Sequence, residues 1–156
     1  MDDAIIAVEC DFSTAESFWK FLEFSGVDLS ASVFLNVEYQ VYSDGAQIWL
    51  PPAFDDAYLK QLTEKKPVPE YMVLQLYPKS LTIGQTAAQM ASIKTYQDYQ
   101  DSDCQMIILA YDGLCAEVYC KNPAWLQTII DHAVCLCGTK VIPKTALDDA
   151  RTSMYL

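Results

Sequence analysis

The stretch CQMIILAYDGLCAEVYCK, residues 104–121, is the part of the sequence that decides the fold. Two apolar segments flank Asp112-Gly113, and an Asp-Gly pair is among the strongest signals for a tight hairpin because it accepts positive φ. We predict a two-residue turn. Its register gives one face, predicted to be the core face, that carries Ile107, Leu109, Tyr111, Leu114, Ala116 and Val118. The other face is also apolar, so we expect a helix or a long loop to cover it.

A second hairpin is predicted upstream of this one. Residues 33–42, VFLNVEYQVY, alternate with the period of a half-buried strand, and Ser43-Asp44-Gly45 turns the chain back. Residues 46–50 then form the antiparallel partner, which ends at Pro51-Pro52 because proline cannot continue a ladder. Further strands are expected at residues 4–8, 71–77 and 139–142, the last of them closed by Pro143.

Helices are expected between these strands. Ser13 and Glu16 have the spacing of a capping box, so a first helix follows them and ends before Gly26. Residues 55–64 indicate a short helix, and residues 123–137 an amphipathic one. The chain is therefore predicted to be an α+β protein, a single globular domain over residues 1–156. Its mainly antiparallel sheet has two or three helices packed against it.

The composition is that of a folded and strongly acidic protein. Of 156 residues, 52% are hydrophobic and 20% are charged, and the formal net charge is −11. Nucleic acids and anionic membrane surfaces are bound through basic patches. The chain does not supply such patches, so we expect neither partner, whereas a basic protein partner remains open.

The start of the sequence and its cysteines indicate the compartment. Met1-Asp2-Asp3 is acidic where a secretory signal needs positive charge, and no apolar run approaches the roughly 18 residues of a membrane span. We therefore expect a cytoplasmic protein, and we interpret its six cysteines as reduced thiols that pack mostly as small apolar groups.

A thiol-dependent enzyme is one alternative that the sequence leaves open. His132 is the single histidine, and it could act as the base for a nucleophilic Cys120 or Cys135. His132 and Cys135 share one face of the predicted helix, but such pairs are commonplace and transfer poorly between families. We assign no catalytic residue.

No metal or cofactor site is predicted. His132, Cys135 and Cys137 are close in sequence, but a structural zinc ion needs four tetrahedral ligands, and residues two apart on a helix point about 200° away from each other. The acidic segment 98–103 lacks the glycine and the closing glutamate of a calcium loop. No glycine-rich phosphate-binding motif occurs in the chain.

The segment 79–103 has no assignable pattern, and candidate partner-binding residues lie in it. Tyrosines suit partner contacts, but two tyrosines three residues apart in a short helix more often dock on the core. The single arginine could clamp a carboxylate or form an ordinary surface ion pair. The predicted partner-binding set is Tyr96, Asp98, Tyr99, Asp101, Asp103 and Arg151.

Three short motifs carry a resemblance to a known family. They are Ser102-Asp103-Cys104, Val118-Tyr119-Cys120-Lys121 and Arg151-Thr152. With them the chain resembles a family of small uncharacterised bacterial proteins of unknown function, mainly over its C-terminal third. The resemblance implies a bacterial cytosolic origin and an α+β fold, and it carries over no functional residue.

Taken together, the sequence favours a small acidic interaction or regulatory protein, for example an immunity-like inhibitor that blocks a basic partner. The thiol-dependent enzyme is one alternative. A structural protein without catalysis is the other, and it could form a homodimer through an exposed sheet edge.

Overall fold

The computed structural model describes residues 4–112, 114–136, 140–146 and 153–155. The strands in this part of the chain are β1 (Ile5–Asp11), β2 (Ser32–Ser43), β3 (Ala46–Ile48), β4 (Ala53–Phe54), β5 (Val68–Pro78), β6 (Met106–Tyr111), β7 (Cys115–Cys120) and β8 (Lys140–Thr145). The helices are α1 (Ala15–Leu22), α2 (Asp56–Lys65), α3 (Ile83–Ser92), α4 (Tyr96–Asp101) and α5 (Pro123–Cys135).

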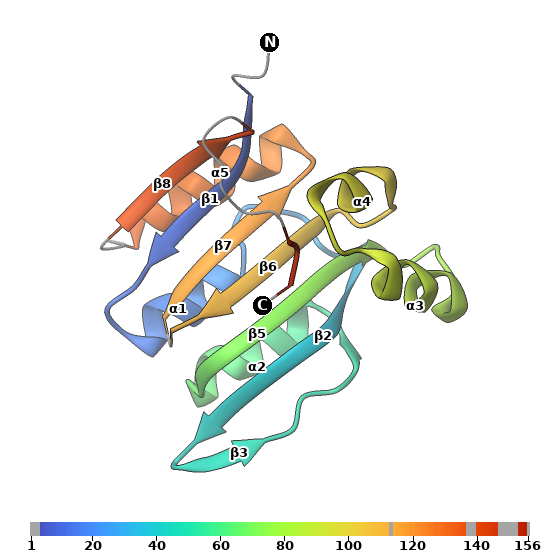
Figure 1. Cartoon of the computed structure of the whole chain (residues 1–156). Coiled ribbons are helices and arrows are strands. Elements are labelled where there is room, and N and C mark those ends of the chain that lie inside the picture. Colours follow the sequence, from blue (N-terminus) through green and yellow to red (C-terminus); the bar gives the residue numbers. More distant parts are fainter. Residues whose placement is uncertain (1–3, 113, 137–139, 147–152, 156) are drawn as a thin grey trace.

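The described strands form one antiparallel sheet. Their order is β3-β2-β5-β6-β7-β1-β8 (Figure 1). Strand β4 also pairs with β2. The hairpin of β6 and β7 lies at the centre of the sheet, as its two apolar faces predict. The α+β class with a mainly antiparallel sheet is confirmed.

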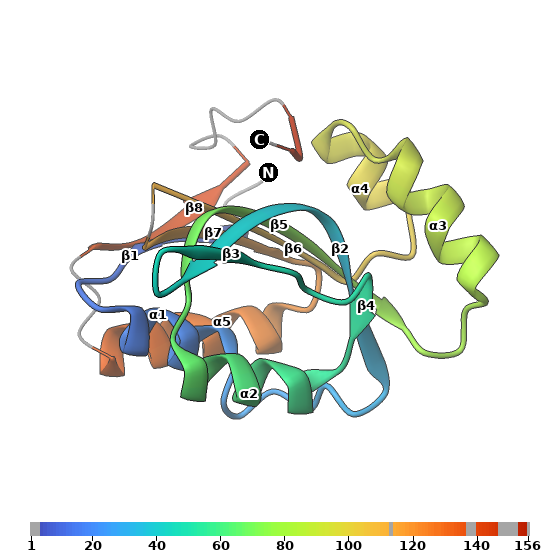
Figure 2. The same ribbon diagram turned by 90° about the horizontal axis from the view of Figure 1, so that it is seen from below.

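Helices lie on both sides of the sheet. Figure 2 shows α1, α2 and α5 together on one face, whereas α3 and α4 lie apart from them beside one end of the sheet. The first three helices cover the larger core, and Tyr96, Tyr99 and Ile93 of the second group pack in a smaller cluster on the opposite face. Three helices on one face agree with the prediction, and α3 and α4 come from the unassigned segment. No helix in the described ranges has both the length and the apolar character needed to cross a membrane.

The register of the central hairpin differs by one residue from the prediction. Tyr111 pairs with Cys115 rather than with Leu114, so three residues instead of two separate the paired ends. Asp112 takes a φ of 51°, and the carbonyl of Leu114 accepts a hydrogen bond from Phe12 N at 3.0 Å instead of joining the ladder.

This shift changes which face of β6 lies in the larger core. Side chains of β6 at Met106, Ile108 and Ala110 belong to the core under the helices, whereas Ile107 and Leu109 belong to the opposite cluster. The predicted core face was therefore wrong for β6. It was right for Ala116 and Val118 of β7, and the expected cover over the second face is present in part as α4.

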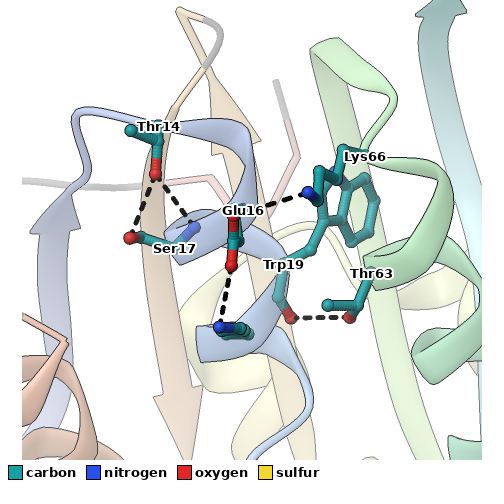
Figure 3. A network of polar contacts seen from close by, with 7 residues as sticks. Thr14, Glu16, Ser17, Trp19, Thr63 and Lys66 are labelled. Carbon is teal, nitrogen blue, oxygen red and sulfur yellow. Dashed lines mark hydrogen bonds and ion pairs between the residues drawn. The ribbon is translucent and has the colours of Figure 1, made fainter.

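Helix α1 begins one residue later than the predicted capping box. Its N-cap is Thr14, whose Oγ1 accepts a hydrogen bond from Ser17 N at 3.1 Å. Glu16 does not close a box with Ser13 but forms ion pairs with Lys20 at 2.9 Å and Lys66 at 3.4 Å (Figure 3).

Polar contacts of Trp19 join α1 to α2. The fully buried indole donates a hydrogen bond from Nε1 to the carbonyl of Pro67 at 2.7 Å. The hydroxyl of Thr63 in α2 donates to the carbonyl of Trp19 (Figure 3). Buried polar groups need partners, so these bonds fix how the two helices meet.

Candidate functional site

The most distinctive surface lies on helices α3 and α4, and local capping signals explain why both helices form. Thr82 caps α3 by accepting a hydrogen bond from Gln85 N, and the Gln85 side chain accepts one in return from Thr82 N. Thr95 and Asp98 form the same reciprocal box at the start of α4. Each box satisfies backbone donors that a helix start leaves without partners.

The two candidate tyrosines anchor α4 on the sheet. Tyr99 is 1% exposed, and its hydroxyl donates a hydrogen bond to the carbonyl of Gln105 at 3.2 Å. Tyr96 is half-buried, with its ring centroid 5.8 Å from that of Tyr99 and 6.0 Å from that of Tyr119 in β7. Tyr99 therefore docks on the core, which leaves it no surface to offer to a partner.

The three candidate aspartates surround one hollow. Asp98, Asp101 and Asp103 line a cavity of about 390 Å³ together with Gln89, Ser92 and Ser102. The structure thus brings together the acids of the predicted set at the junction of α3, α4 and the segment that enters β6. Arg151 lies outside the described residues.

These carboxylates are held in place by neighbouring amides. The backbone N–H groups of Lys94 and Thr95 donate to Asp98 at 3.0 Å each and lower the pKa of its carboxyl below the ordinary value. Asp103 accepts a hydrogen bond from Gln89 Nε2 at 2.8 Å, and Asp101 accepts one from the Gln97 side chain at 3.0 Å. Asp101 and Asp103 remain exposed to solvent.

Lys121 is a nearby cation that is committed to other contacts. Its Nζ donates to the carbonyl of Ser102 at 2.6 Å and lies 4.8 Å from the ring centroid of Tyr99. Partial burial lowers the pKa of Lys121, although the carboxylates of Asp103 and Asp101 oppose this shift.

An apolar groove of about 500 Å³ lies on the other side of α3, between this helix and β2. On α3, Ile83, Ala87 and Met90 have the spacing of one helix face and line the groove. Ile83 is 89% exposed, and Thr86 is the only buried residue of α3. The remaining wall residues are Val33, Leu35, Asn36, Pro52, Ala53, Leu81 and Thr86.

The residues of the thiol-enzyme alternative lie on α5 and at the end of β7. The ring Nε2 of His132 makes a hydrogen bond of 3.2 Å with the carbonyl of Lys20. Cys120 is buried, which raises the pKa of its thiol to about 11. Cys135 is exposed at the end of α5, and Cys137 lies outside the described residues. In the ranges that the structure describes, no three His, Cys, Asp or Glu side chains are arranged to hold a metal ion.

The groove was not predicted from the sequence. The two capping boxes, Thr82 with Gln85 and Thr95 with Asp98, are visible in the sequence and could have located α3 and α4. The helical spacing of Ile83, Ala87 and Met90 could then have identified an apolar face. No local signal shows that β2 stands opposite that face, because the contact is between segments far apart in the chain.

Comparisons with known proteins give a family and a distant relative. The model of a family described as "Protein of unknown function (DUF2691)" matches residues 55–155. The chain is 27% identical over 85 residues to "Uncharacterized protein YncE" of Bacillus subtilis (strain 168), and the match covers 54% of each protein. The chain therefore spans about half the length of this relative. No solved structure matches.

The predicted resemblance to an uncharacterised family is confirmed, but its predicted extent was too small. The family match begins at residue 55, so it includes α2, β5, α3 and α4 besides the C-terminal third. Helices α3 and α4 lie wholly within the matched range, whereas the groove wall formed by β2 and residues 52–53 lies before it.

Proposed function

We propose, on the premise that the chain belongs to the DUF2691 family of proteins of unknown function, that it is an acidic interaction module whose α3–α4 surface binds a basic protein partner. The observation that carries the proposal is the gathering of Asp98, Asp101 and Asp103 round one hollow, on the helix pair that also borders an open apolar groove.

Electrostatics supports a basic partner for this surface. The net charge of −11 repels acidic proteins at long range and attracts basic ones, which raises the association rate more than the final affinity. Asp101 and Asp103 are exposed, so they can meet cationic side chains without any rearrangement of the fold. Single ion pairs at such exposed positions contribute little, so several must act together.

A charge-neutralising pair of substitutions tests this proposal. Asp101→Asn together with Asp103→Asn keeps the oxygens that accept from Gln97 and Gln89 but removes two negative charges. The matched control, Asp44→Asn with Glu64→Gln, removes the same charge from exposed positions in the β2–β3 turn and on α2.

Partners are captured on the immobilised chain at low salt, identified, purified and then titrated against each variant. We expect a basic partner whose association rate constant falls about three- to tenfold for the Asp101→Asn, Asp103→Asn variant and much less for the control. We also expect this difference to shrink at high salt, where exposed charges are screened. An acidic partner, or equal losses for the two variants, would refute the proposal.

A further inference from the structure

The groove between α3 and β2 has a fixed shape because several contacts hold α3 in place. Helix α3 is fixed at its start by the Thr82 capping box and near its end by the buried Ile93. Between these points Gln89 clamps Asp103 through two hydrogen bonds, with Asp103 N donating to Oε1 at 2.6 Å and Nε2 donating to Oδ2 at 2.8 Å. The helix is therefore held in place although its apolar face contacts little of the sheet.

The backbone around the groove excludes an extended strand as its occupant. Both edges of β2 are already paired at this point, since Leu35 is opposite Ala53 of β4 and Gln75 of β5. The backbone N–H of Asn36 donates to the carbonyl of Pro52 at 2.9 Å. Strand β4 has two residues and is too short to serve as a template for another strand.

An occupant must therefore contribute side chains and satisfy its own backbone. An α-helix does both, because its N–H and C=O groups bond to each other and its apolar residues at positions i, i+3 or i+4, and i+7 form a ridge that fits an apolar groove. An extended peptide in the same place would bury backbone groups without partners.

Charge decides whether the helix in the groove belongs to a second copy of this chain or to a basic partner protein. A second copy of this chain also carries a net charge of −11, so self-association through the groove works against long-range repulsion. None of the described side chains that line the groove is charged, and three aspartates line the hollow on the other side of α3. A helix with an apolar face and basic flanks complements both features.

We propose that the groove between α3 and β2 binds the apolar face of a basic amphipathic helix of a partner protein. This inference rests on the proposed function and adds where, and in which conformation, the partner binds. Recognition is of the helix-in-groove kind, with Ile83, Ala87 and Met90 forming one wall and Val33 and Leu35 forming part of the other.

Defined peptides and two matched variants test this inference on the whole chain. The probe is a fluorescent peptide of about 18 residues, made of leucine and lysine with the leucines on one helix face. One control peptide has the same composition in a scrambled order, and a second has glutamate in place of lysine. Ala87→Phe fills the groove, whereas Ala88→Phe adds the same ring to the neighbouring exposed position, which does not line the groove.

We expect the amphipathic lysine peptide to bind and the Ala87→Phe variant to bind it about tenfold more weakly, with the Ala88→Phe variant within about twofold of the unmodified chain. A second groove variant, Ile83→Ser, removes an apolar wall residue that is 89% exposed, so it should weaken binding without unfolding the chain. Circular dichroism checks that each variant is folded.

The remaining outcomes separate this inference from the proposed function. Equal binding of the scrambled lysine peptide, or equal losses at residues 87 and 88, would show charge-driven binding without the groove, so the groove inference fails and the proposed function stands. Equal binding of the glutamate peptide, or no binding of any lysine peptide, would overturn both. Self-association that Ala87→Phe abolishes would make a second copy the occupant and would overturn the groove inference.

Discussion

At the scale of single residues, burial governs the chemistry of the thiols. Cys10 and Cys104 are inaccessible in the core, and this burial raises the pKa of each thiol to about 12. Burial likewise raises the pKa of Cys120 to about 11. The thiolate is the reactive form, so these three side chains are both shielded and protonated near neutral pH.

Alkylation of the native protein should therefore distinguish the cysteines. At pH 7 a small reagent is expected to modify the exposed Cys135 first and the half-buried Cys115 more slowly, because burial and the neighbouring Asp11 raise the pKa of Cys115 to about 11. Cys10, Cys104 and Cys120 should react only after unfolding in urea. Mass spectrometry of the digested protein gives the order, and rapid native labelling of Cys120 would revive the thiol-dependent enzyme.

At the scale of elements, the central hairpin shows what a sequence pattern can and cannot determine. The two strands and their antiparallel pairing follow from apolar runs on either side of Asp112. The register does not follow, because a shift of one residue normally exposes apolar side chains, and here both faces of β6 are buried. Ile107 and Ile108 are equally suited to the core, so the pattern cannot choose between them.

Helices α3 and α4 were missed for a different reason. They are short, α4 spans six residues, and α3 buries a single side chain. Neither helix therefore shows the long apolar periodicity by which α5 was predicted. Their stability comes from caps and from docking of Tyr99, and docking on the sheet is a contact that no local pattern contains. Asp98, Asp101 and Asp103 line one hollow, whereas the groove on the other side of α3 was not predicted.

Two ion pairs of Glu9 add to the backbone pairing of β8 with β1, and their contribution is sensitive to pH. Glu9 accepts contacts of 3.2 Å from both Lys140 and Lys144. Partial burial acts to raise the pKa of Glu9, but the hydrogen bonds and charges of the two lysines outweigh it and hold the pKa below its ordinary value of 4.5. Because the pKa of Glu9 is lowered in the folded protein, the two ion pairs contribute fully to stability above pH 4.5. This contribution is lost as the pH falls through the folded-state pKa of Glu9.

Substitution of Glu9 by glutamine tests how this contribution to stability depends on pH. At pH 7 we expect Glu9→Gln to lower the free energy of unfolding by about 0.5–1 kcal/mol, as for partly exposed ion pairs. The difference from the unmodified protein should shrink progressively below pH 4.5, because protonation then removes the same charge. Urea unfolding at several pH values measures this difference in the free energy of unfolding, with Glu64→Gln at an exposed position of α2 as the control. A difference that persists at low pH would show that packing, rather than charge, is responsible.

At the scale of the whole molecule, the two ends of the sheet determine whether copies can pair edge to edge. The sheet order was not predictable from the sequence, because β1 and β8 pair across more than a hundred residues. The strand expected near residue 140 is present as β8 at one edge of the sheet, but Pro143 lies within β8 instead of ending it. The opposite edge is formed by β3, which has three residues, and by β4, which has two.

These edges lead us to expect a monomer. Proline cannot donate a ladder hydrogen bond, lysines discourage pairing, and an edge of two or three residues offers few partners. Light scattering coupled to size-exclusion chromatography should therefore give the mass of one chain at a concentration of about 100 μM, well above that of most cellular proteins.

Pro143→Val restores a backbone donor in β8, and it should raise the apparent mass at the same concentration, whereas Ala88→Phe on exposed α3 should not. A dimer of the unmodified chain that Pro143→Val strengthens would instead favour the homodimer through a sheet edge. In that case the repulsion between two chains of net charge −11 would be overcome by strand pairing.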